Sequence, residues 1–428
     1  MSDEPDRRPD VSEALRLKRD YVWPCVYHFY RRPPLIVAAE DCDLIDADGR
    51  RYLDLYSGVT VVNAGHCNAA INAAAAAQMA RLDHTTTIYL SEPMLRLAER
   101  LARITPGELK RSFFCASGSE ANEAAMLLAS LYTGRGEFVA LSHSLHGRTK
   151  AAMSVTGLEM WRTDPSLPAT VHFAPRPDAA EDERNAGERL AGELDAVIHR
   201  AGPDRVAALV AEPIQGNGGI VVPPPDYWPR VRDICDRHGI LLIFDEVQTG
   251  MNRTGRWWAC EHWGVTPDIL TSAKALANGY PIAAVVTADR IAAAYARPGA
   301  STFGGNPVGA AAAMATIDYH QRHGLGQRSQ ALGARLLDRL RSLSADRSAL
   351  RRPRGMGLMV AVDVVAGSDQ PSPERLDALL EELKDRGYLC GKTGPQRNVL
   401  TLMPPLTITR ERLDAFIDEL PAAMEAIG

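Results

Sequence analysis

At the centre of the chain stands Leu241-Leu242-Ile243-Phe244-Asp245-Glu246-Val247-Gln248-Thr249-Gly250, an apolar run that ends abruptly in two acids. Four consecutive apolar residues leave no polar face, which is typical of a strand that is buried on both sides of a sheet. A carboxylate directly after such a strand lies at the edge where α/β sheets bind ligands. The stretch therefore predicts an α/β core with a ligand site at the end of this strand.

Similar apolar runs occur on both sides of this stretch. We expect further strands at 113–116, 138–141, 207–210 and 282–286. The spacing of apolar residues over 119–131 and 227–235 predicts helices between them. Strands that alternate with helices indicate the α/β class, with a large lobe whose mostly parallel sheet is covered by helices on both faces.

The two ends of the chain have a different pattern. Residues 1–60 carry turn signals such as Asp48-Gly49 between short strand-like runs, and a long helical pattern begins near residue 316. We expect residues 1–60 and 316–428 to combine into one smaller α+β lobe. Residues 61–315 would then form the large domain.

Charge and hydropathy exclude several partners. The 428 residues include 48 Lys and Arg against 53 Asp and Glu, a net charge of −5, so no basic footprint for nucleic acid or an anionic membrane is present. No apolar run approaches the roughly 18 residues of a membrane span. The acidic start Met1-Ser2-Asp3-Glu4 is unlike a secretory signal. These features predict a soluble, cytoplasmic protein.

The seven cysteines are scattered and never spaced as CxxC, which favours reduced thiols over disulfides or a zinc site. His143 and His146 flank one loop without a third ligand nearby in the sequence. We therefore expect no metal.

Four features with chemical potential lie at predicted strand ends. Ser117-Gly118-Ser119-Glu120 joins a strand to a helix, whose free N–H groups and partial positive charge suit a phosphate. Asp245 could hold a ring nitrogen protonated. Lys274 is flanked by small and apolar residues, so burial would lower its pKa and expose an amine able to form a Schiff base. Thr302 precedes the glycine pair Gly304-Gly305.

Each feature also has a structural interpretation, such as a helix cap or a solvated lysine. Together, however, a phosphate anchor, a ring-nitrogen partner and an imine-forming lysine are what pyridoxal 5'-phosphate (PLP) requires from a protein. Their order and type favour a PLP site over chance co-occurrence.

These motifs resemble those of the class III, or ω-type, aminotransferases, which have the aspartate-aminotransferase-like fold (PLP fold type I). The resemblance extends from Tyr52-Leu53-Asp54-Leu55 to the C-terminal region. It rests on the following motifs: Ser117-Gly118-Ser119-Glu120-Ala121, His146-Gly147-Arg148-Thr149, Glu212-Pro213-Ile214-Gln215-Gly216, Asp245 to Gly250, Lys274, Thr302-Phe303-Gly304-Gly305-Asn306-Pro307 and Pro404-Pro405-Leu406-Thr407.

The resemblance implies a role for each matching residue. Lys274 would bind the cofactor and move a proton at the substrate carbon, and Asp245 would pair with the pyridine nitrogen. Val247 would pack on one ring face, and Gln248 would approach the ring hydroxyl. The last set holds the phosphate: Gly118, Ser119 and, from the neighbouring subunit of a homodimer, Thr302.

Two positions depart from the family pattern. Leu145, before His146, stands where an aromatic ring usually stacks on the cofactor. Thr401 stands where many relatives carry an arginine that grips a substrate carboxylate, and in such relatives Glu212 often pairs with that arginine. We assign Glu212 and Thr401 to substrate binding. Glu212 would either offer a free carboxylate to a cationic donor or bind backbone amides beside an apolar, open pocket, and Lys392 or Arg397 could supply a displaced anion site.

The function predicted is transamination by ping-pong half-reactions, from an amine or ω-amino donor to a 2-oxo acid. Loss of the arginine favours pyruvate or glyoxylate over 2-oxoglutarate as acceptor. Two alternatives stay open: a decarboxylase, racemase or phospho-lyase on the same scaffold, and a non-catalytic PLP-fold binding protein.

Overall fold

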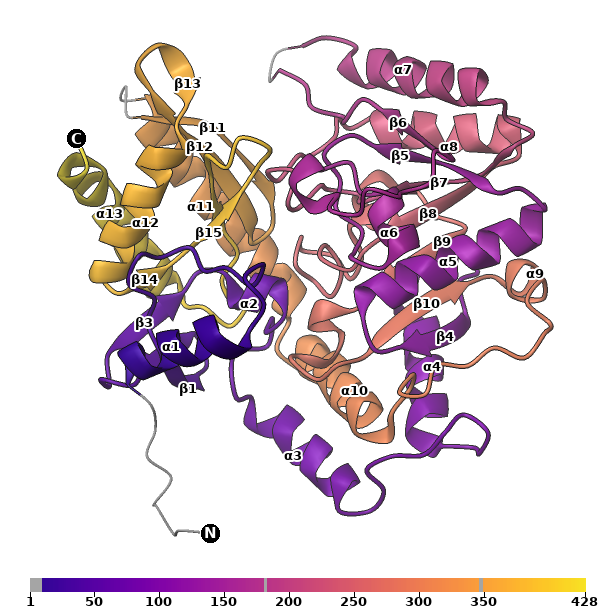
Figure 1. Cartoon of the computed structure of the whole chain (residues 1–428), viewed down its shortest axis with the longest axis horizontal. Helices are drawn as coiled ribbons and strands as arrows, with labels where there is room; N and C mark the ends of the chain where they lie inside the picture. The colour runs from indigo at the N-terminus through magenta and orange to yellow at the C-terminus, as the bar shows by residue number, and fades with distance from the viewer. Residues whose placement is uncertain (1–9, 181–182, 346–348) are drawn as a thin grey trace.

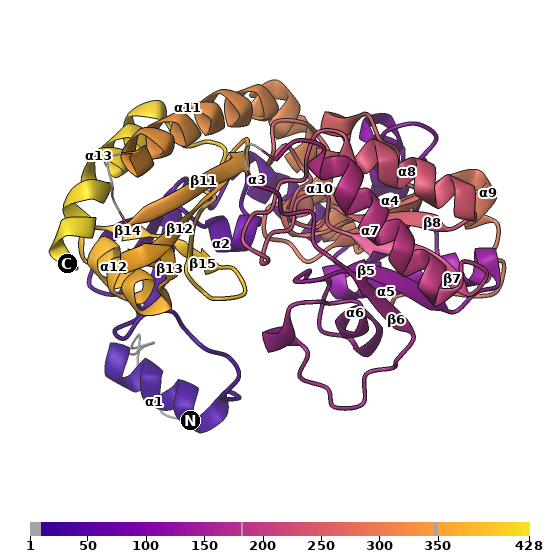
Figure 2. The same ribbon diagram turned by 90° about the horizontal axis from the view of Figure 1, so that it is seen from above.

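The computed structural model describes residues 10–180, 183–345 and 349–428, and they form two lobes. Figure 1 shows the central part of the chain in the lobe on the right and both chain ends in the lobe on the left. Figure 2 shows the same division from above. The predicted α/β class with a second lobe is confirmed.

The large lobe is built on a seven-stranded sheet. In spatial order its strands are β4 (Arg111–Cys115), β10 (Ala283–Thr287), β9 (Ile269–Ser272), β8 (Leu241–Asp245), β7 (Val206–Ala211), β5 (Glu137–Leu141) and β6 (Val171–Ala174). The run from β9 to β6 is parallel throughout, whereas β10 is antiparallel to both of its neighbours. The sheet is therefore mostly parallel, as predicted.

Alternation along each strand divides the core of this lobe into two clusters. Leu242 and Phe244 of β8 belong to the cluster that includes the buried face of α8 (Tyr227–His238). Leu241 and Ile243 belong to the other, with residues of α5 (Gly118–Thr133). Because successive side chains of a strand point to opposite faces, a continuous apolar run is required when helices cover both.

Helices on both faces complete the large lobe, with α7 and α8 on the opposite side from α5 and α6 (Figure 2). The remaining helical segments are α4 (Glu92–Ile104), α6 (Lys150–Ser154), α7 (Ala186–Ala201), α9 (Asp289–Ala292), α10 (Pro307–Arg322) and the short 3₁₀ turns η1 (Glu159–Trp161), η2 (Ala259–Trp263) and η3 (Lys274–Ala277).

Two further sheets form the smaller lobe. One has the order β1 (Ile36–Glu40), β2 (Asp43–Asp46), β3 (Arg51–Asp54) and β14 (Tyr388–Leu389), so it joins the two chain ends through the parallel pair β3–β14. The other runs β11 (Leu350–Met356), β12 (Met359–Ala366), β16 (Val399–Leu402) and β15 (Gly391–Thr393), with β13 (Gln370–Pro371) beside β12. The domain boundary that we expect near residue 315 falls inside α10.

Helices from both ends surround these sheets. They are α1 (Val11–Tyr21), α2 (Ser57–Thr60), α11 (Leu325–Ala345), α12 (Pro373–Asp385) and α13 (Arg410–Ala426), with the 3₁₀ turn η4 (Gly367–Asp369). Helix α3 (Ala69–Met79) packs against α10 of the large lobe instead. Ser372 caps α12 by accepting a hydrogen bond from the backbone of Arg375. Pro373 is tolerated at the first turn because an N–H at that position would have no partner within the helix.

A buried arginine connects the lobes. The guanidinium of Arg253 donates hydrogen bonds to the carbonyl oxygens of Leu358 (2.8 Å) and Pro404 (2.7 Å) and to the side chain of Asn63. Burial of this fully enclosed group lowers its pKa to about 9. The hydrogen bonds satisfy several donors of the arginine and link segments far apart in the sequence.

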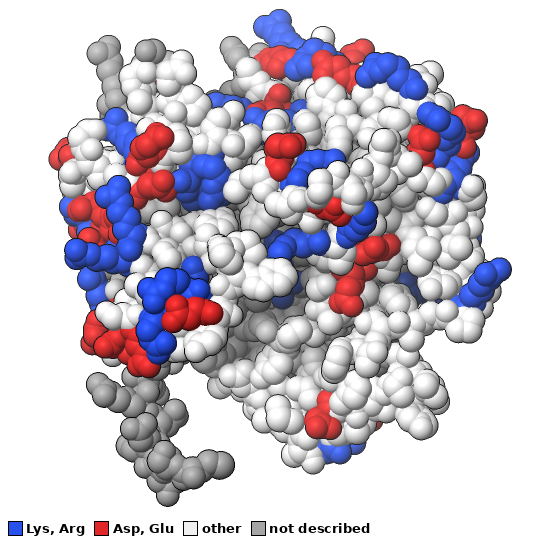
Figure 3. Space-filling view, viewed as in Figure 1, with Lys and Arg blue, Asp and Glu red and all other residues white. Residues whose placement is uncertain are grey.

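The surface agrees with the even charge balance. On the face in Figure 3, basic and acidic residues are interspersed, and neither sign forms a continuous field. None of the helices in the described residues is long and apolar enough to cross a membrane. The cytoplasmic location stays a prediction, and Met1 to Glu4 lie outside the described residues.

Candidate active site

A cavity of about 860 Å³ opens between the lobes. Its walls come from the N-terminal segment, the strand ends of the large sheet and the C-terminal strands. Of the residues predicted from the sequence to form the site, the following line this cavity: Gly118, Ser119, Leu145, His146, Glu212, Asp245, Val247, Gln248 and Lys274. The fold therefore brings together residues that are up to 156 positions apart in the chain, from Gly118 to Lys274.

Asp245 ends β8 and is only 4% exposed. Its Oδ2 accepts hydrogen bonds from Nδ2 of Asn122 (2.7 Å) and from Nδ1 of His146 (2.8 Å). Its Oδ1 accepts one from the backbone N–H of Val247 (3.0 Å). Three donors thus fix the carboxylate in one orientation.

Asn122 was not predicted from the sequence. Its amide donates to Asp245 and to the carbonyl oxygen of His146, while its own carbonyl accepts from the hydroxyl of Thr271 (2.7 Å). Asn122 comes from α5 and Thr271 from β9. No spacing rule marks such a network, because its members belong to elements that meet only in the folded chain.

His146 is buried behind Asp245. Burial opposes its protonation, but the hydrogen bond and the charge of Asp245 outweigh this effect and raise the pKa of His146. Its Nε2 is buried and has no hydrogen-bond partner among the described residues. An imidazolium here would reinforce the negative charge on Asp245.

Lys274 begins η3 directly after β9 and is open to the cavity. Burial lowers the pKa of its ammonium, although the charges of Asp245 and Glu212 act in the opposite direction. The backbone φ of Lys274 is +22°, a sparsely populated region for a residue with a side chain. Backbone strain of this kind is most frequent at active sites and ligand-binding segments.

The amino end of α5 forms another part of the wall. Ser117 caps the helix by accepting a hydrogen bond from the backbone of Glu120 (3.3 Å), and the hydroxyl of Ser119 accepts one from the backbone of Arg148 (3.0 Å). Gly147 has φ of +144°, and a Cβ there would lie 2.4 Å from Oγ of Ser119. Two chain segments therefore approach closely at a helix N-terminus, a geometry that suits a phosphate.

The residues after Asp245 also fit tightly. A Cβ on Gly118 would lie 3.0 Å from Cγ1 of Val247, and a Cβ on Gly216 would lie 1.9 Å from Oε1 of Gln248. Nε2 of Gln248 contacts Sδ of Met403 at 3.6 Å. Val247 thus packs closely against Gly118, and a larger residue at position 216 would displace the side-chain amide of Gln248.

Glu212 lines the cavity, but both of its oxygens are occupied. Oε1 accepts a hydrogen bond from the backbone of Leu145 (2.9 Å) and Oε2 from the backbone of Gly216 (2.8 Å). Burial raises the pKa of Glu212. Of the two expectations for this residue, the geometry matches the one in which it binds backbone amides, and the free carboxylate is not observed.

Thr401 does not line the cavity, so its assignment to substrate binding is corrected. It is fully buried in β16, where its hydroxyl bonds that of Thr393 (2.8 Å) in the adjacent β15. Lys392 and Arg397 do line the cavity. Nζ of Lys392 is paired with Asp377 (2.5 Å), whereas Arg397 forms no ion pair with any described carboxylate.

Thr302 is exposed and lies outside the cavity of its own chain. The adjacent Phe303 contacts the ring of His84 at 5.3 Å, and Asn306 donates to the carbonyl oxygen of Asp83. The segment around Thr302 therefore lies beside the loop that precedes α4, on the surface of the subunit.

Aromatic side chains complete the wall that faces the small lobe. The ring of Phe29 lies 5.9 Å from that of Tyr27 and 6.2 Å from that of Tyr56, and the guanidinium of Arg397 lies 5.5 Å from Phe29. All four residues line the cavity. The wall thus presents a broad apolar surface with one unpaired cation.

Known proteins share this fold. A family model described as aminotransferase class-III matches residues 30–424. The chain belongs to the class-III aminotransferases. Among relatives of this class-III aminotransferase, an acetylornithine aminotransferase of Methanosarcina mazei is 40% identical over 403 residues, covering 93% of this chain and 94% of that protein. The alanine–glyoxylate aminotransferase 2 homolog 2 of Arabidopsis thaliana is 36% identical and covers 97% and 88%.

Relatives with other printed activities are similar too. The leucine/methionine racemase of Thermococcus litoralis is 40% identical, covering 92% of the chain and 90% of that protein. Among solved structures, a PLP-bound amine transaminase from an uncultivated Pseudomonas species has a TM-score of 0.90 at 33% identity, covering 96% and 99%. A phospholyase from Arthrobacter has a TM-score of 0.89 at 31% identity, covering 96% and 99%.

Class-III aminotransferases depend on PLP, and the residues of this cavity fit that cofactor. A lysine, a buried carboxylate held by three donors and a helix N-terminus without a nearby Cβ open into one space. These donors match a carbonyl, a ring nitrogen and a phosphate, the three groups by which the protein would hold PLP.

Proposed function

We propose that this class-III aminotransferase moves an amino group from an amine or ω-amino donor to a small 2-oxo acid, with pyruvate or glyoxylate as acceptor. The proposal rests on which cationic side chains line the cavity and which of them are free of carboxylates. Beside the aromatic wall, Arg397 forms no ion pair with a described carboxylate and Lys392 is paired with Asp377, while Thr401 supplies no cation. Arg148 also lines the cavity without an ion pair to a described carboxylate, but it adjoins Ser119 at the proposed phosphate site, where its backbone N–H donates to the Ser119 hydroxyl.

The residues of the chain have separate tasks in this reaction. When bound, PLP supplies the electron sink for carbanion chemistry. Lys274 would hold the cofactor through its Nζ and would move a proton to and from the substrate carbon. Asp245 would pair with the ring nitrogen, and hydrogen bonds from Asn122 and His146 hold its carboxylate in place for this.

The phosphate would be held by Gly118 and Ser119 at the start of α5, where the helix offers unpaired N–H groups. Val247 would pack against one ring face and Gln248 would approach the ring hydroxyl. Leu145 would cover the other face by apolar contact, without the extra stacking energy that an aromatic ring provides, about 0.5–1.5 kcal/mol.

The preferred acceptor follows from the number of carboxylates that the cationic groups of the wall can bind. An acceptor such as pyruvate needs one cation for its single carboxylate, whereas 2-oxoglutarate needs two, and a guanidinium binds a carboxylate through paired N–H donors. Arg397 supplies one such group at the wall next to Phe29. The aromatic surface of Tyr27, Phe29 and Tyr56 then favours donors with an apolar substituent.

The test compares the two half-reactions of Arg397→Gln. Loss of a hydrogen bond to a charged group removes about 1.5–3 kcal/mol of binding free energy, so kcat/KM for pyruvate should fall about 10- to 100-fold. The half-reaction with a donor amine that has no carboxylate should change little. Arg386→Gln, at the end of α12 and paired with Glu382 and Glu419, is the control. An equal loss in both half-reactions, or a preference for 2-oxoglutarate, would contradict the proposal.

A second candidate is favoured by the similarity to a racemase and a phospholyase. The same PLP scaffold can break other bonds at the substrate carbon, because the cofactor anchors do not select the bond. Stoichiometry separates the two functions. Transamination consumes one keto acid for every amine, whereas racemisation and phosphate elimination proceed with no keto acid present.

We also propose a homodimer with shared active sites. Ile88, Leu90 and Phe303 are large apolar side chains with exposed fractions of 83%, 89% and 61%. We call these three residues the apolar patch. Thr302 adjoins it and is outside its own cavity, which is consistent with a hydroxyl that reaches the phosphate site of a second copy.

A further inference from the structure

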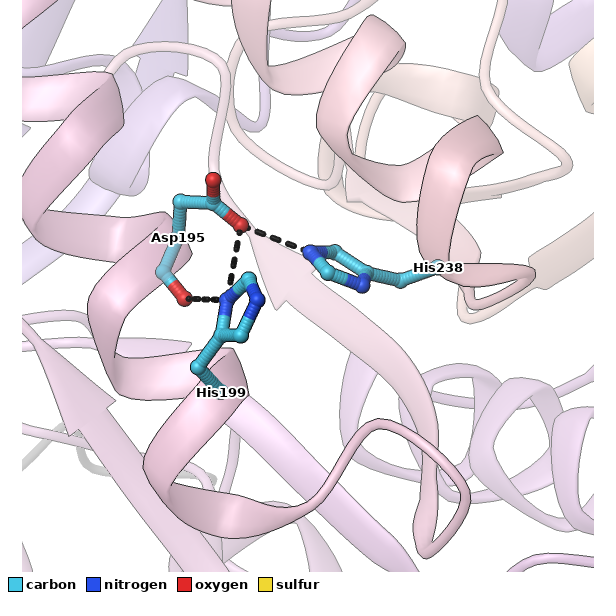
Figure 4. Close-up of side chains that lie close together, drawn as sticks. All are labelled: Asp195, His199 and His238. Carbon is cyan, nitrogen blue, oxygen red and sulfur yellow. Dashed lines mark hydrogen bonds and ion pairs between the residues drawn. The ribbon is translucent and has the colours of Figure 1, made fainter.

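A second group of potential ligands lies in the outer helical layer of the large lobe. Asp195 and His199 are one turn apart on α7, and His238 is the last residue of α8. Figure 4 shows the three side chains converging between the two helices. Their ligand atoms all lie within 4.8 Å of one another, and none of the three residues lines the active-site cavity.

One carboxylate oxygen faces both imidazole rings. Oδ1 of Asp195 lies 2.6 Å from Nε2 of His238 and 3.3 Å from Nδ1 of His199. The two rings meet edge to face with centroids 4.7 Å apart. Each histidine directs one ring nitrogen at this oxygen. Three potential ligand atoms, two nitrogens and one oxygen, therefore face the same small space.

We propose that Asp195, His199 and His238 bind a divalent transition metal of the zinc class and thereby fasten α7 to α8. Two imidazole nitrogens and one carboxylate oxygen are ligands that Zn²⁺ accepts, with water in the fourth position. Mg²⁺ and Ca²⁺ prefer oxygen ligands alone, so the donor set selects against them.

The distances are close to those of a tetrahedral site. Zinc bonds of about 2.0–2.1 Å place neighbouring ligand atoms about 3.3 Å apart. The contact between Asp195 and His199 already has this length, at 3.3 Å. The contact between Asp195 and His238 must lengthen by about 0.7 Å. His199 must also release the carbonyl oxygen of Asp195, which lies 3.1 Å from its Nδ1.

The neighbours of Asp195 leave one of its oxygens directed at the histidines. Arg237 contacts the other oxygen, Oδ2, at 3.4 Å, so Oδ1 remains directed at the histidines. The ring of His199 is exposed to solvent, which provides an entry path for the ion.

The proposal is tested by titrating ZnCl₂ into the PLP-loaded enzyme, prepared without an affinity tag and freed of excess PLP. Cys25 and Cys67 are exposed thiols that bind zinc on their own, so the background carries Cys25→Ser and Cys67→Ser. Calorimetry should show one zinc ion per chain and a raised unfolding temperature. Asp195→Asn and His199→Ala should each weaken zinc binding at least about tenfold.

His172→Gln is the matched control, because His172 is also paired with a carboxylate, Glu137, at 2.7 Å but belongs to no three-ligand group among the described residues. Its affinity for zinc should be unchanged. X-ray absorption of the zinc-loaded background should show two imidazole ligands. Absence of saturable binding, a first shell without imidazole, or an equal loss in His172→Gln would overturn the proposal.

Discussion

At the scale of single residues, the orientation of Asp245 depends most on Asn122. Asn122→Ala removes one of three donors to the buried carboxylate and leaves the hydroxyl of Thr271 without its acceptor. A hydrogen bond to a charged group contributes about 1.5–3 kcal/mol, so the affinity for PLP should fall about 10- to 100-fold. Fluorescence titration of the apoenzyme with PLP measures this.

Asn72→Ala is the control for Asn122→Ala, since Asn72 lies on the surface and accepts only from the hydroxyl of Tyr280 at 3.2 Å. Unchanged PLP affinity in Asn122→Ala, or the same loss in both variants, would show that Asn122 does not position Asp245.

Lys274 is the residue on which the chemistry should depend most. Reduction of the PLP-loaded enzyme with borohydride, followed by peptide mapping, should place the pyridoxyl group on Lys274. Lys274→Ala should lose activity by about 10³-fold or more, because it removes both the covalent link and the proton carrier. Lys150→Ala, an exposed lysine outside the cavity, should retain activity. A label on Lys150 or Lys392 would refute the assignment.

The sequence was informative about residues whose role depends on local context. Asp245 after an apolar run and Lys274 among small residues were both placed in the cavity from their neighbours alone. Thr401 was misplaced because its orientation depends on how β16 pairs with β12 and β15. Asn122 was missed because a side-chain hydrogen bond between α5 and β8 leaves no periodic signal.

At the scale of elements, the close approach of the loop at Gly147 to α5 requires the absence of a Cβ. Gly147→Ala would place a methyl group 2.4 Å from Oγ of Ser119 at φ of +144°. Strain of about 1–3 kcal/mol should displace Ser119 and weaken PLP binding about 10- to 100-fold. Equilibrium dialysis with PLP measures the effect.

Gly192→Ala on α7 gives the opposite expectation. A Cβ at Gly192 meets nothing within 4 Å, so the change should stabilise the protein by about 1 kcal/mol in chemical unfolding. PLP affinity should be unaffected. If Gly147→Ala were as harmless as Gly192→Ala, the tight approach at Ser119 would be incorrect.

The turn after β8 contains a buried acid with a pH-dependent effect on stability. Burial raises the pKa of Glu246 from its ordinary value of 4.5 to about 7, against hydrogen bonds from Thr249, Cys260 and Ala259. Between these values the folded protein keeps a proton that the unfolded chain has released. The free energy of unfolding should therefore fall by roughly 3 kcal/mol as pH rises from about 4.5 to 7.

Glu246→Gln should remove that part of the pH dependence, as measured by urea unfolding at pH 5 and pH 8. Glu188→Gln, an exposed position on α7, should follow the parent protein. Parallel profiles for the parent protein and Glu246→Gln would show that this carboxyl is ionised over the whole range.

Elements were predictable where the pattern was continuous. The runs that became β4, β5, β7, β8 and β10, and the helices α5 and α8, follow from apolar periodicity. β6 was not predicted, because Val171-His172-Phe173 lies at the edge of the sheet and mixes polar and apolar residues. The antiparallel direction of β10 has no sequence signal, since a strand buried on both faces has the same composition in either direction.

At the scale of the whole molecule, the proposed shared site predicts complementation between two inactive chains. Thr302→Ala and Lys274→Ala should each be impaired alone. A mixed dimer would contain one site that combines an intact Lys274 with an intact Thr302 from the other copy. Refolding the two variants together should restore up to half of the activity per mixed dimer.

Phe303→Asp, in the apolar patch, should lower the dimer fraction in analytical ultracentrifugation, because a charge would enter a buried apolar contact. Arg386→Asp, on α12 away from this patch, serves as its control. A fully active monomer at low concentration would exclude the shared site.

The pairing of β3 with β14 also determines when during synthesis this sheet can be completed. Leu53 of β3 pairs with Tyr388 of β14, 335 positions later in the chain. At a synthesis rate of about 5–20 residues per second, the N-terminal strands leave the ribosome roughly 20 to 70 s before their partner exists. During that interval the edge of β3 is open to other strands, so the newborn chain is most vulnerable to mispairing before Tyr388 and Leu389 are made.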